Sequence, residues 1–272
     1  MKRIGNLYEK VCSIENLQLA DEKARKGKLR TYGVIEHDKK REVNLLKLRE
    51  TLLNGTFHTS KYDVFTIYEP KEREIYRLPY FPDRILHHAI MNVLEPIWVS
   101  TFTADTYSCI KNRGIHAAAK KVKQALREDP EGTTFCLKLD IRKFYPSINH
   151  DVLKSILRRK LKDKRLLRLL DEIIDSADGV PIGNYLSQYF ANLYLTYFDH
   201  WIKEQKRVKH YFRYADDIVI LASDKSYLHS LMGEIRAYLG DLKLEVKGNW
   251  QVFPVAARGI DFVGYVFFQT HT

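Results

Sequence analysis

Two adjacent aspartates, Asp216 and Asp217, stand between two short apolar runs, residues 211–215 and 218–221. Apolar runs on both sides of a polar pair are typical of a β-hairpin whose loop carries the polar side chains. Aspartate is common in ordinary turns because its side chain bonds the local backbone. At the tip of a buried hairpin, however, two neighbouring carboxylates repel each other unless a cation lies between them. The pair therefore predicts either a plain turn or a cation site.

A third acid, Asp140, lies near the end of another predicted strand, residues 135–141, in which apolar and polar side chains alternate. Three acids on the ends of neighbouring strands would form an oxygen-rich site, which suits Mg²⁺. Two such ions roughly 3.5–4 Å apart can activate an attacking hydroxyl and stabilise the leaving oxygen of phosphoryl transfer. The acids thus predict a site for two Mg²⁺ ions, in which Mn²⁺ is expected to substitute.

The composition indicates a folded protein with a polyanionic partner. Of the 272 residues, 45% are hydrophobic and 29% are charged, which excludes a disordered or fibrous chain. The 45 Lys and Arg exceed the 34 Asp and Glu, giving a formal charge of +11. That excess favours nucleic acid as the partner, although a solvated basic surface would give the same count. Together with the acids, it points to nucleotidyl transfer on nucleic acid.

The sequence shows no signal for membrane insertion, secretion or disulfide bonding. No apolar run approaches the ~20 residues of a membrane span, and the first residues lack the apolar core of a signal peptide. The three cysteines, Cys12, Cys109 and Cys136, are far apart, which argues against structural zinc and against a disulfide framework. We therefore expect a cytoplasmic protein without a membrane partner.

Periodicity predicts an α+β fold in which antiparallel hairpins pack against helices. Helical spacing of apolar residues occurs at 6–53, 85–94, 114–126, 152–174, 187–201 and 226–239. Strands are predicted at 62–68, 75–78, 135–141, 211–221, 242–246 and 260–266. Asp83 is expected to cap the helix that follows it.

Four motifs, taken in order, resemble the reverse transcriptase family. YADD (214–217) matches the YxDD box of that family, and DIRKFY (140–145) resembles its other catalytic block, an Asp followed by an aromatic pair. EREIYRLPYFPDR (72–84) resembles the fingers block that ends in Asp-Arg, and GIDFVGY (259–265) is similar to the late palm block. Each motif alone is weak evidence, but the shared order over nearly the whole chain is specific.

The resemblance implies a right-hand polymerase fold that copies RNA into DNA. It implies that Asp140 and Asp216 hold the metal ions, that Asp217 is the third acid, and that the Ile141 carbonyl helps to bind metal. It also implies the following division: N-terminal helices and fingers at 1–115, the first palm strand at 116–146, connecting helices at 147–180, and the hairpin palm at 181–272. Because the sequence ends soon after the late palm block, the thumb is expected to be largely missing.

The resemblance also assigns residues around the incoming nucleotide. Tyr145 falls at the position that excludes a ribose 2′-hydroxyl, although a core aromatic would fit there too. Lys71 and Arg73 align with fingers residues that hold the triphosphate; a guanidinium fits phosphate in bidentate fashion, whereas a lysine acts as a point charge. Lys247 is a candidate general acid toward pyrophosphate, or simply an exposed lysine.

The turn PIGNYLSQ (181–188) departs from the general family pattern. Ile182 stands before Gly183 where group II intron and retroviral enzymes carry Gln, and Gln188 stands where many carry Pro. This turn and residues 249–254 resemble the reverse transcriptases of diversity-generating retroelements. That resemblance implies error-prone copying of a template RNA from dNTPs in mutagenic retrohoming, with a small basic accessory variability protein as a partner. Because Ile182 offers packing but no hydrogen bond near the nascent base pair, discrimination should be weaker.

Five basic residues on predicted helices are candidate contacts for the backbone of an RNA/DNA hybrid, which is recognised mainly by its shape and backbone. They are Lys120, Lys121, Lys123, Arg158 and Arg159. Three other functions stay open: an RNA-templated RNA polymerase, a group II intron maturase, and a non-catalytic nucleic-acid scaffold. Tyr145 argues against the first, the 182–188 block against the second, and the intact acids against the third.

Overall fold

The computed structural model describes residues 3–68 and 72–270, and the chain forms two compact units. Unit 1 comprises Met1–Ser100 and His150–Phe190, and unit 2 comprises Thr101–Asn149 and Ala191–Thr272. The chain therefore passes between the units near residues 100, 149 and 190. The regions expected from the sequence, which change at 115, 146 and 180, stay a prediction. Because the chain crosses three times, no single linker divides the sequence.

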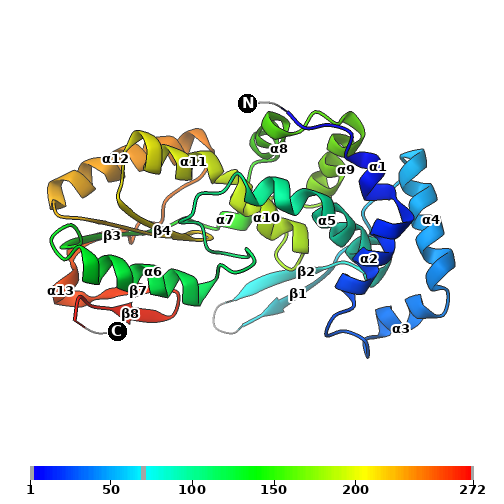
Figure 1. Ribbon diagram of the computed structural model, residues 1–272, viewed down its shortest axis with the longest axis horizontal. Helices are drawn as coiled ribbons and strands as arrows, with labels where there is room; N and C mark the ends of the chain where they lie inside the picture. The colour runs from blue at the N-terminus through cyan, green and yellow to red at the C-terminus, as the bar shows by residue number, and fades with distance from the viewer. Residues whose placement is uncertain (1–2, 69–71, 271–272) are drawn as a thin grey trace. The chain divides into compact units, whose positions relative to one another are not determined.

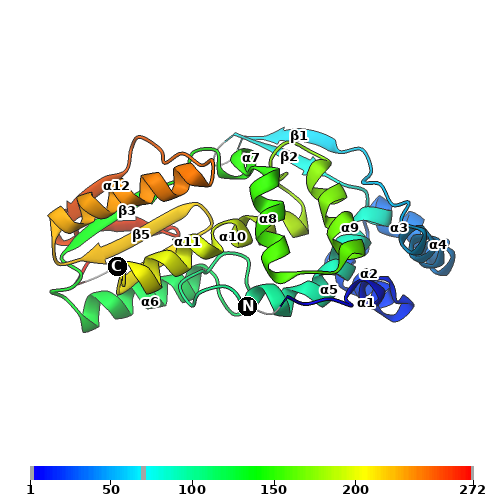
Figure 2. The ribbon, with the colours of Figure 1, turned by 90° about the horizontal axis from the view of Figure 1, so that it is seen from above.

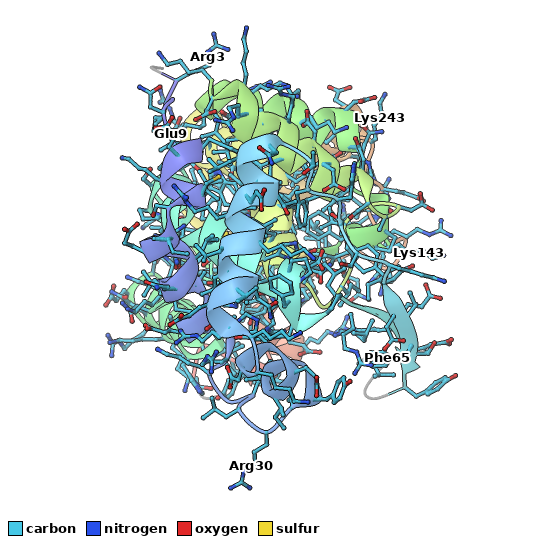
Figure 3. All side chains as sticks on the ribbon, turned by 90° about the vertical axis from the view of Figure 1, so that its right-hand side faces the viewer. Arg3, Glu9, Arg30, Phe65, Lys143 and Lys243 are labelled. Atoms are coloured by element: carbon cyan, nitrogen blue, oxygen red, sulfur yellow. The ribbon has the colours of Figure 1, made fainter. Side chains whose placement is uncertain are left out.

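Helices make up most of unit 1 (Figure 1). They are α1 (Tyr8–Cys12), α2 (Ile14–Ala24), α3 (Tyr32–Asp38), α4 (Arg41–Asn54), α5 (Ile85–Val99), α8 (His150–Lys160), α9 (Lys164–Asp175) and the first part of α10 (Tyr185–Tyr194), with a π-helical turn η1 (Tyr80–Arg84) before α5. Small and aliphatic side chains such as Ala20, Ala89 and Ile90 are fully buried where α2 packs on α5. The loop from α2 to α3 is basic, and Arg30 projects from it into solvent (Figure 3).

Two details of unit 1 correct the predictions. Asp83 does not cap α5, because it is buried in η1 and its carboxylate accepts the Ser60 N–H at 2.9 Å. The basic stretch 152–174 forms two helices instead of one. Asp163 interrupts it and caps α9 by accepting the N–H groups of Arg165 and Leu166, each at 3.2 Å. As a result, α8 and α9 lie side by side (Figure 2).

A two-stranded antiparallel ribbon, β1 (Asp63–Ile67) and β2 (Arg73–Arg77), completes unit 1. Phe65 pairs with Ile75 in its register, which confirms the predicted hairpin. Residues 69–71, in the connection, lie outside the described residues. Val64 and Phe65 remain 48% and 41% exposed, so the ribbon is held by its backbone ladder more than by burial.

Unit 2 is built on a four-stranded antiparallel sheet in the order β4-β5-β3-β6. The strands are β3 (Phe135–Asp140), β4 (His210–Tyr214), β5 (Asp217–Ala222) and β6 (Gln251–Pro254), and a separate hairpin comprises β7 (Ile260–Phe262) and β8 (Tyr265–Phe267). The helices are α6 (Ile115–Glu128), α7 (Phe144–Ser147), α11 (Thr196–His200), η2 (Trp201–Gln205), α12 (Lys225–Asp241) and α13 (Val255–Arg258).

Alternation along β3 separates the two faces of this sheet. Cys136 packs in one core cluster with Ala118 and Val122 of α6, and α12 covers the opposite face (Figure 1). Lys138 and Asp140 follow Cys136 at steps of two, so they belong to the α6 face. The strand therefore buries its middle and delivers an acid at its end.

Two predictions in unit 2 are wrong in detail. The helix expected at 187–201 breaks at Leu195 into α10 and α11. Residues 242–246 form no strand: Leu244 is buried and Val246 makes a single bridge to Ile141, so the apolar pattern there reflects burial, and β6 supplies the sheet edge instead. Within residues 3–68 and 72–270, none of the helices is both long enough and apolar enough to span a bilayer.

Candidate active site

The three predicted acids lie where β3 meets the β4–β5 hairpin. Asp140, the last residue of β3, is directly opposite Asp217, the first residue of β5. Asp216 precedes it in a two-residue loop with Ala215, whose φ is +55°. The Asp216 carbonyl accepts the Ile141 N–H at 3.3 Å, which ties the loop to the end of β3. The predicted Asp-Asp turn is therefore shifted by one residue, because Asp217 belongs to the strand ladder.

Asp140 and Asp216 form a closely interacting pair. Burial and the neighbouring Asp140 carboxyl raise the pKa of Asp216 well above its usual range. Burial also raises the pKa of Asp217, partly opposed by the Lys138 ammonium. One carboxylate oxygen of Asp140, Oδ1, is buried and has no hydrogen-bond partner among the described residues. A buried acceptor without a donor, beside a second carboxyl, fits a bound cation.

Two lysines offset the negative charge. Lys247 bonds Asp140 Oδ2 through its ammonium, and its backbone N–H donates to the Asp140 carbonyl at 2.8 Å. Lys138 bonds Asp217 Oδ1 and lies 5.1 Å from the centre of the Phe262 ring. Lys247 was predicted from the sequence, whereas Lys138 was missed. The signal for Lys138 is its position two residues before Asp140, which places both side chains on one face of β3.

A buried ion pair anchors the hairpin that carries Asp216. Arg213 and Asp199 are both 0% exposed and are joined by hydrogen bonds of 2.7 and 2.6 Å. The hydroxyls of Tyr211 and Thr106 donate to the same carboxylate at 2.5 and 2.9 Å. Another guanidinium nitrogen donates to the Ala215 carbonyl at 3.0 Å, in the loop itself. Sequence reasoning missed this network, although an arginine within an apolar strand was a usable signal.

Tyr145 lies in α7, just beyond the end of β3. Its ring packs edge-on against Phe144, with ring centroids 5.6 Å apart. Burial, with a contribution from the Asp216 charge, raises the pKa of the Tyr145 phenol. The structure thus places Tyr145 beside the acids in unit 2, and its steric role toward a ribose stays a prediction.

The donor set suits a hard cation, because Asp140, Asp216 and Asp217 all offer carboxylate oxygens. Nevertheless, in the part of the chain that the structure describes, no three His, Cys, Asp or Glu side chains are arranged as a metal cluster. Two of the acids are paired with ammonium groups instead: Lys138 bonds Asp217, and Lys247 bonds one oxygen of Asp140.

The sequence itself matches a known family. Residues 69–267 fit the family model described as reverse transcriptase (RNA-dependent DNA polymerase). This chain belongs to the reverse transcriptase family. The match includes all three acids and both lysines of the site, so the site lies within the reverse transcriptase domain.

Several curated proteins are similar to this chain over different lengths. Protein YkfC of Escherichia coli strain K12 is 26% identical over 271 residues, which cover 82% of this chain and 71% of YkfC. The group II intron-encoded protein LtrA of Lactococcus lactis subsp. cremoris is 23% identical over 191 residues, 65% of this chain and 31% of LtrA. Nuclear intron maturase 4 of Arabidopsis thaliana is 27% identical over 161 residues, 56% of this chain and 20% of that protein. The chain thus spans less than a third of these two intron-related proteins.

Solved structures show the same polymerase fold. Apo telomerase from Candida tropicalis superposes with a TM-score of 0.55 at 13% identity, over 78% of this chain and 48% of the telomerase chain. The same telomerase with a fragment of telomeric RNA gives a TM-score of 0.56 at 14% identity, over 78% and 44%. The α+β fold predicted from the sequence is therefore confirmed.

The residues predicted to hold the incoming nucleotide from the fingers fall in unit 1. Arg73 begins β2, is exposed, and has no ion-pair partner within the described residues, and Lys71 lies outside them. The Ile182 carbonyl accepts the Tyr76 N–H at 2.8 Å, so the 181–184 turn continues the free edge of β2. Gly183 has a φ of +116°, and a Cβ there would lie 2.9 Å from the Tyr76 carbonyl. The turn therefore requires glycine at 183.

Gly183 and Gln188 line a cavity of about 320 Å³ in unit 1, together with Arg84 and His87. Nε of Arg84 and Nε2 of His87 are buried without a partner among the described residues. Burial lowers the pKa of the Arg84 guanidinium and lowers the pKa of His87 to about 3. The turn that departs from the family pattern thus borders a cavity that contains two buried nitrogens without hydrogen-bond partners among the described residues.

The basic residues predicted to contact nucleic acid are in different surroundings. Lys120, Lys121 and Lys123 are exposed on α6 in unit 2. Arg158, on α8 in unit 1, is held by the Asp171 carboxylate, with one contact of 3.0 Å, and this pairing raises the pKa of its guanidinium. Much of the Arg158 charge is therefore compensated within the protein. Arg159 is exposed on the same helix, and all five contacts stay predictions.

Proposed function

We propose that this chain copies an RNA template into DNA from deoxynucleoside triphosphates with the help of two Mg²⁺ ions. The observation that carries the proposal is the buried Oδ1 of Asp140, an acceptor without a donor beside Asp216. Because the chain belongs to the reverse transcriptase family, we assign metal-assisted nucleotidyl transfer to this pair of acids. Mn²⁺ would fit the same oxygen donors.

In this proposal, each residue of the site has a separate role in nucleotide addition. Asp140 and Asp216 would hold the ions with the Ile141 carbonyl, and Asp217 would complete the site. When bound, Mg²⁺ would supply the positive charge that activates the primer 3′-hydroxyl and stabilises the leaving oxygen. Lys247, already bonded to Asp140, would donate a proton toward pyrophosphate. Tyr145 would exclude a 2′-hydroxyl by its bulk.

Within the family, we propose the diversity-generating retroelement type, with error-prone copying of a template RNA and an accessory variability protein as partner. The support is Ile182 in place of Gln. Because its backbone carbonyl is fixed by the Tyr76 N–H, a change of side chain should leave the turn in place. Ile182→Gln should therefore add a hydrogen-bonding side chain beside the nascent base pair without disturbing the turn.

A second candidate is a group II intron type of reverse transcriptase. The similarity to LtrA and to nuclear intron maturase 4 favours it. The two types differ in the errors that they leave, so one sequencing experiment separates them.

The polymerase proposal is tested by primer extension on a defined RNA template with dNTPs and Mg²⁺. Asp216→Asn and Asp140→Asn should abolish extension, and they should also lose the rise in melting temperature that Mg²⁺ produces in the unaltered protein. Asp261→Asn is the matched control, since Asp261 is an exposed acid on β7 that acts on Asp217 only through its charge. Near-normal extension by Asp216→Asn would refute the assignment of the acids.

The subtype is tested by sequencing the products. Errors concentrated opposite template adenines, and reduced by Ile182→Gln, would support the diversity-generating type. Evenly spread errors that Ile182→Gln does not change would refute it and leave the group II intron type.

A further inference from the structure

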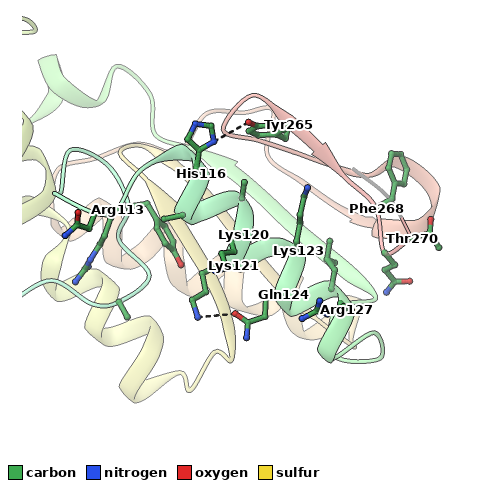
Figure 4. A pocket seen from close by; sticks show the side chains of 17 residues that line it. Arg113, His116, Lys120, Lys121, Lys123, Gln124, Arg127, Tyr265, Phe268 and Thr270 are labelled. Carbon is green, nitrogen blue, oxygen red and sulfur yellow. Dashed lines mark hydrogen bonds between the residues drawn. The ribbon is translucent and has the colours of Figure 1, made fainter.

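Helix α6 has two chemically different sides. Its inner side, with Ala118, Val122 and Leu126, is buried in the core of unit 2. Its outer side carries exposed basic residues, which Figure 4 shows projecting from the helix. They are Lys120, Lys121, Lys123 and Arg127.

A groove of about 1160 Å³ runs along this outer side (Figure 4). Its second wall comprises Tyr265 of β8 and the residues that follow the strand, among them Phe268. At one end, the Tyr265 hydroxyl and Nδ1 of His116 are 3.5 Å apart. No Asp or Glu occurs among the described residues that line the groove. The groove is open to solvent and is lined, among the described residues, by cationic side chains without acids, which suits a polyanionic polymer.

The charge of this groove is poorly compensated. Lys120 and Lys123 make no hydrogen bond or ion pair with any part of the chain that the structure describes. Lys121 donates to Gln124 at 3.2 Å, which leaves its charge in place. Arg127 and Glu128 are 3.3 Å apart but mostly exposed, so their attraction is weak. Four like charges therefore remain, and a row of phosphates would neutralise them.

The aromatic wall narrows the choice of polymer. Tyr265 lines the groove and is 36% exposed. Bases inside a duplex are already stacked on each other, whereas a single strand offers free base faces to aromatic side chains. We propose that the α6–β8 groove binds a single-stranded segment of the RNA template. The choice of RNA rests on the proposed function.

The first test removes the charges. A labelled 12-nucleotide oligouridylate is bound to the triple variant Lys120→Gln/Lys123→Gln/Arg127→Gln, and its anisotropy is followed between 50 and 200 mM salt. Three lost phosphate contacts should weaken binding about 50-fold at 0.15 M salt and reduce the salt slope by about 2. The control, Lys10→Gln/Lys40→Gln/Lys47→Gln, loses the same charge from exposed positions of unit 1 and should bind as the unaltered protein does. Equal loss in both variants would overturn the proposal.

The second test removes the aromatic face. Tyr265→Leu should weaken binding of the oligouridylate about 5- to 150-fold, whereas Tyr265→Phe, which keeps the ring, should not. Binding of a blunt RNA duplex should change little in Tyr265→Leu. Equal effects of Leu and Phe, or an equal loss for the duplex, would refute a single-strand groove. Because binding is measured without dNTPs, in the Asp216→Asn background as well, its result is independent of whether the chain polymerises.

Discussion

Asp199→Asn is the perturbation that probes the hairpin most directly. The Asp199 carboxylate accepts four hydrogen bonds, two from Arg213 and one each from Tyr211 and Thr106. The variant keeps the shape but removes the charge, so a fully buried guanidinium is left uncompensated. Breaking a buried ion pair by removing one partner costs about 3–5 kcal/mol. An asparagine oxygen still accepts some of these bonds, so we expect about 3 kcal/mol, or about 6–12 °C in melting temperature.

The same change should impair catalysis beyond its effect on stability. Arg213 also donates to the Ala215 carbonyl, and Ala215 holds a positive φ next to Asp216. When the guanidinium is no longer fixed, Asp216 is no longer held in place, and misplacement by about 1 Å can cost about 100-fold in rate. We therefore expect kcat for primer extension to fall about 10- to 100-fold at 20 °C, where the variant is still folded, with KM for dNTP little changed.

Asp21→Asn is the matched control. Asp21 is also 0% exposed and pairs with Arg25 and Arg41 at 2.7 and 2.5 Å, but it belongs to unit 1, whereas the hairpin belongs to unit 2. It should lower the melting temperature by a similar amount while kcat at 20 °C stays close to normal. If both variants lose kcat equally, or if Asp199→Asn keeps its kcat, the positioning argument is wrong.

A double variant separates charge compensation from positioning. Asp199→Leu/Arg213→Met replaces the ion pair with apolar side chains, an exchange that is often neutral for stability. The melting temperature should recover, whereas kcat should stay low because the Ala215 carbonyl still lacks its donor. Recovery of both would show that Arg213 contributes only to stability.

Three further predictions concern other residues. Burial lowers the pKa of His87 to about 3, so below about pH 6.5 the unfolded chain binds a proton at His87 that the folded chain does not bind. The unfolding free energy from urea titrations should therefore fall by about 2 kcal/mol between pH 7.5 and pH 5. His87→Leu should make the unfolding free energy depend less on pH over this range. Gly183→Ala should lower the unfolding free energy measured by urea titration by about 1–3 kcal/mol, whereas Gly233→Ala, in open space on α12, should not lower it. Tyr145→Ala should admit ribonucleotides in primer extension and Tyr145→Phe should exclude them; equal selectivity in the two would remove Tyr145 from sugar discrimination.

Local patterns were enough to locate the hairpin that carries the candidate catalytic acids. Alternation over residues 135–141 predicted β3, and the apolar runs on both sides of Asp216 and Asp217 predicted β4 and β5, because both patterns are properties of the strands themselves. Asp140, Asp216 and Asp217 were found because acids that follow apolar strands are unusual enough to stand out. The order of four motifs identified the family. In contrast, the cap at Asp83 and the strand at 242–246 were wrong, since tertiary burial overrides a local pattern.

Only the tertiary structure revealed what surrounds those acids. Lys138 bonds Asp217, which is 79 residues away in sequence, and Asp199 lies seventeen residues before Asp216, so no short-range pattern shows either pairing. Their roles depend on the register of β3 against β5 and on the packing of α11 beneath the hairpin. The sequence by itself determined which groups can do the chemistry, because that depends on residue type. The fold decided which charges are paired and which oxygen is left unpaired, because pairing depends on distances between segments far apart in the chain.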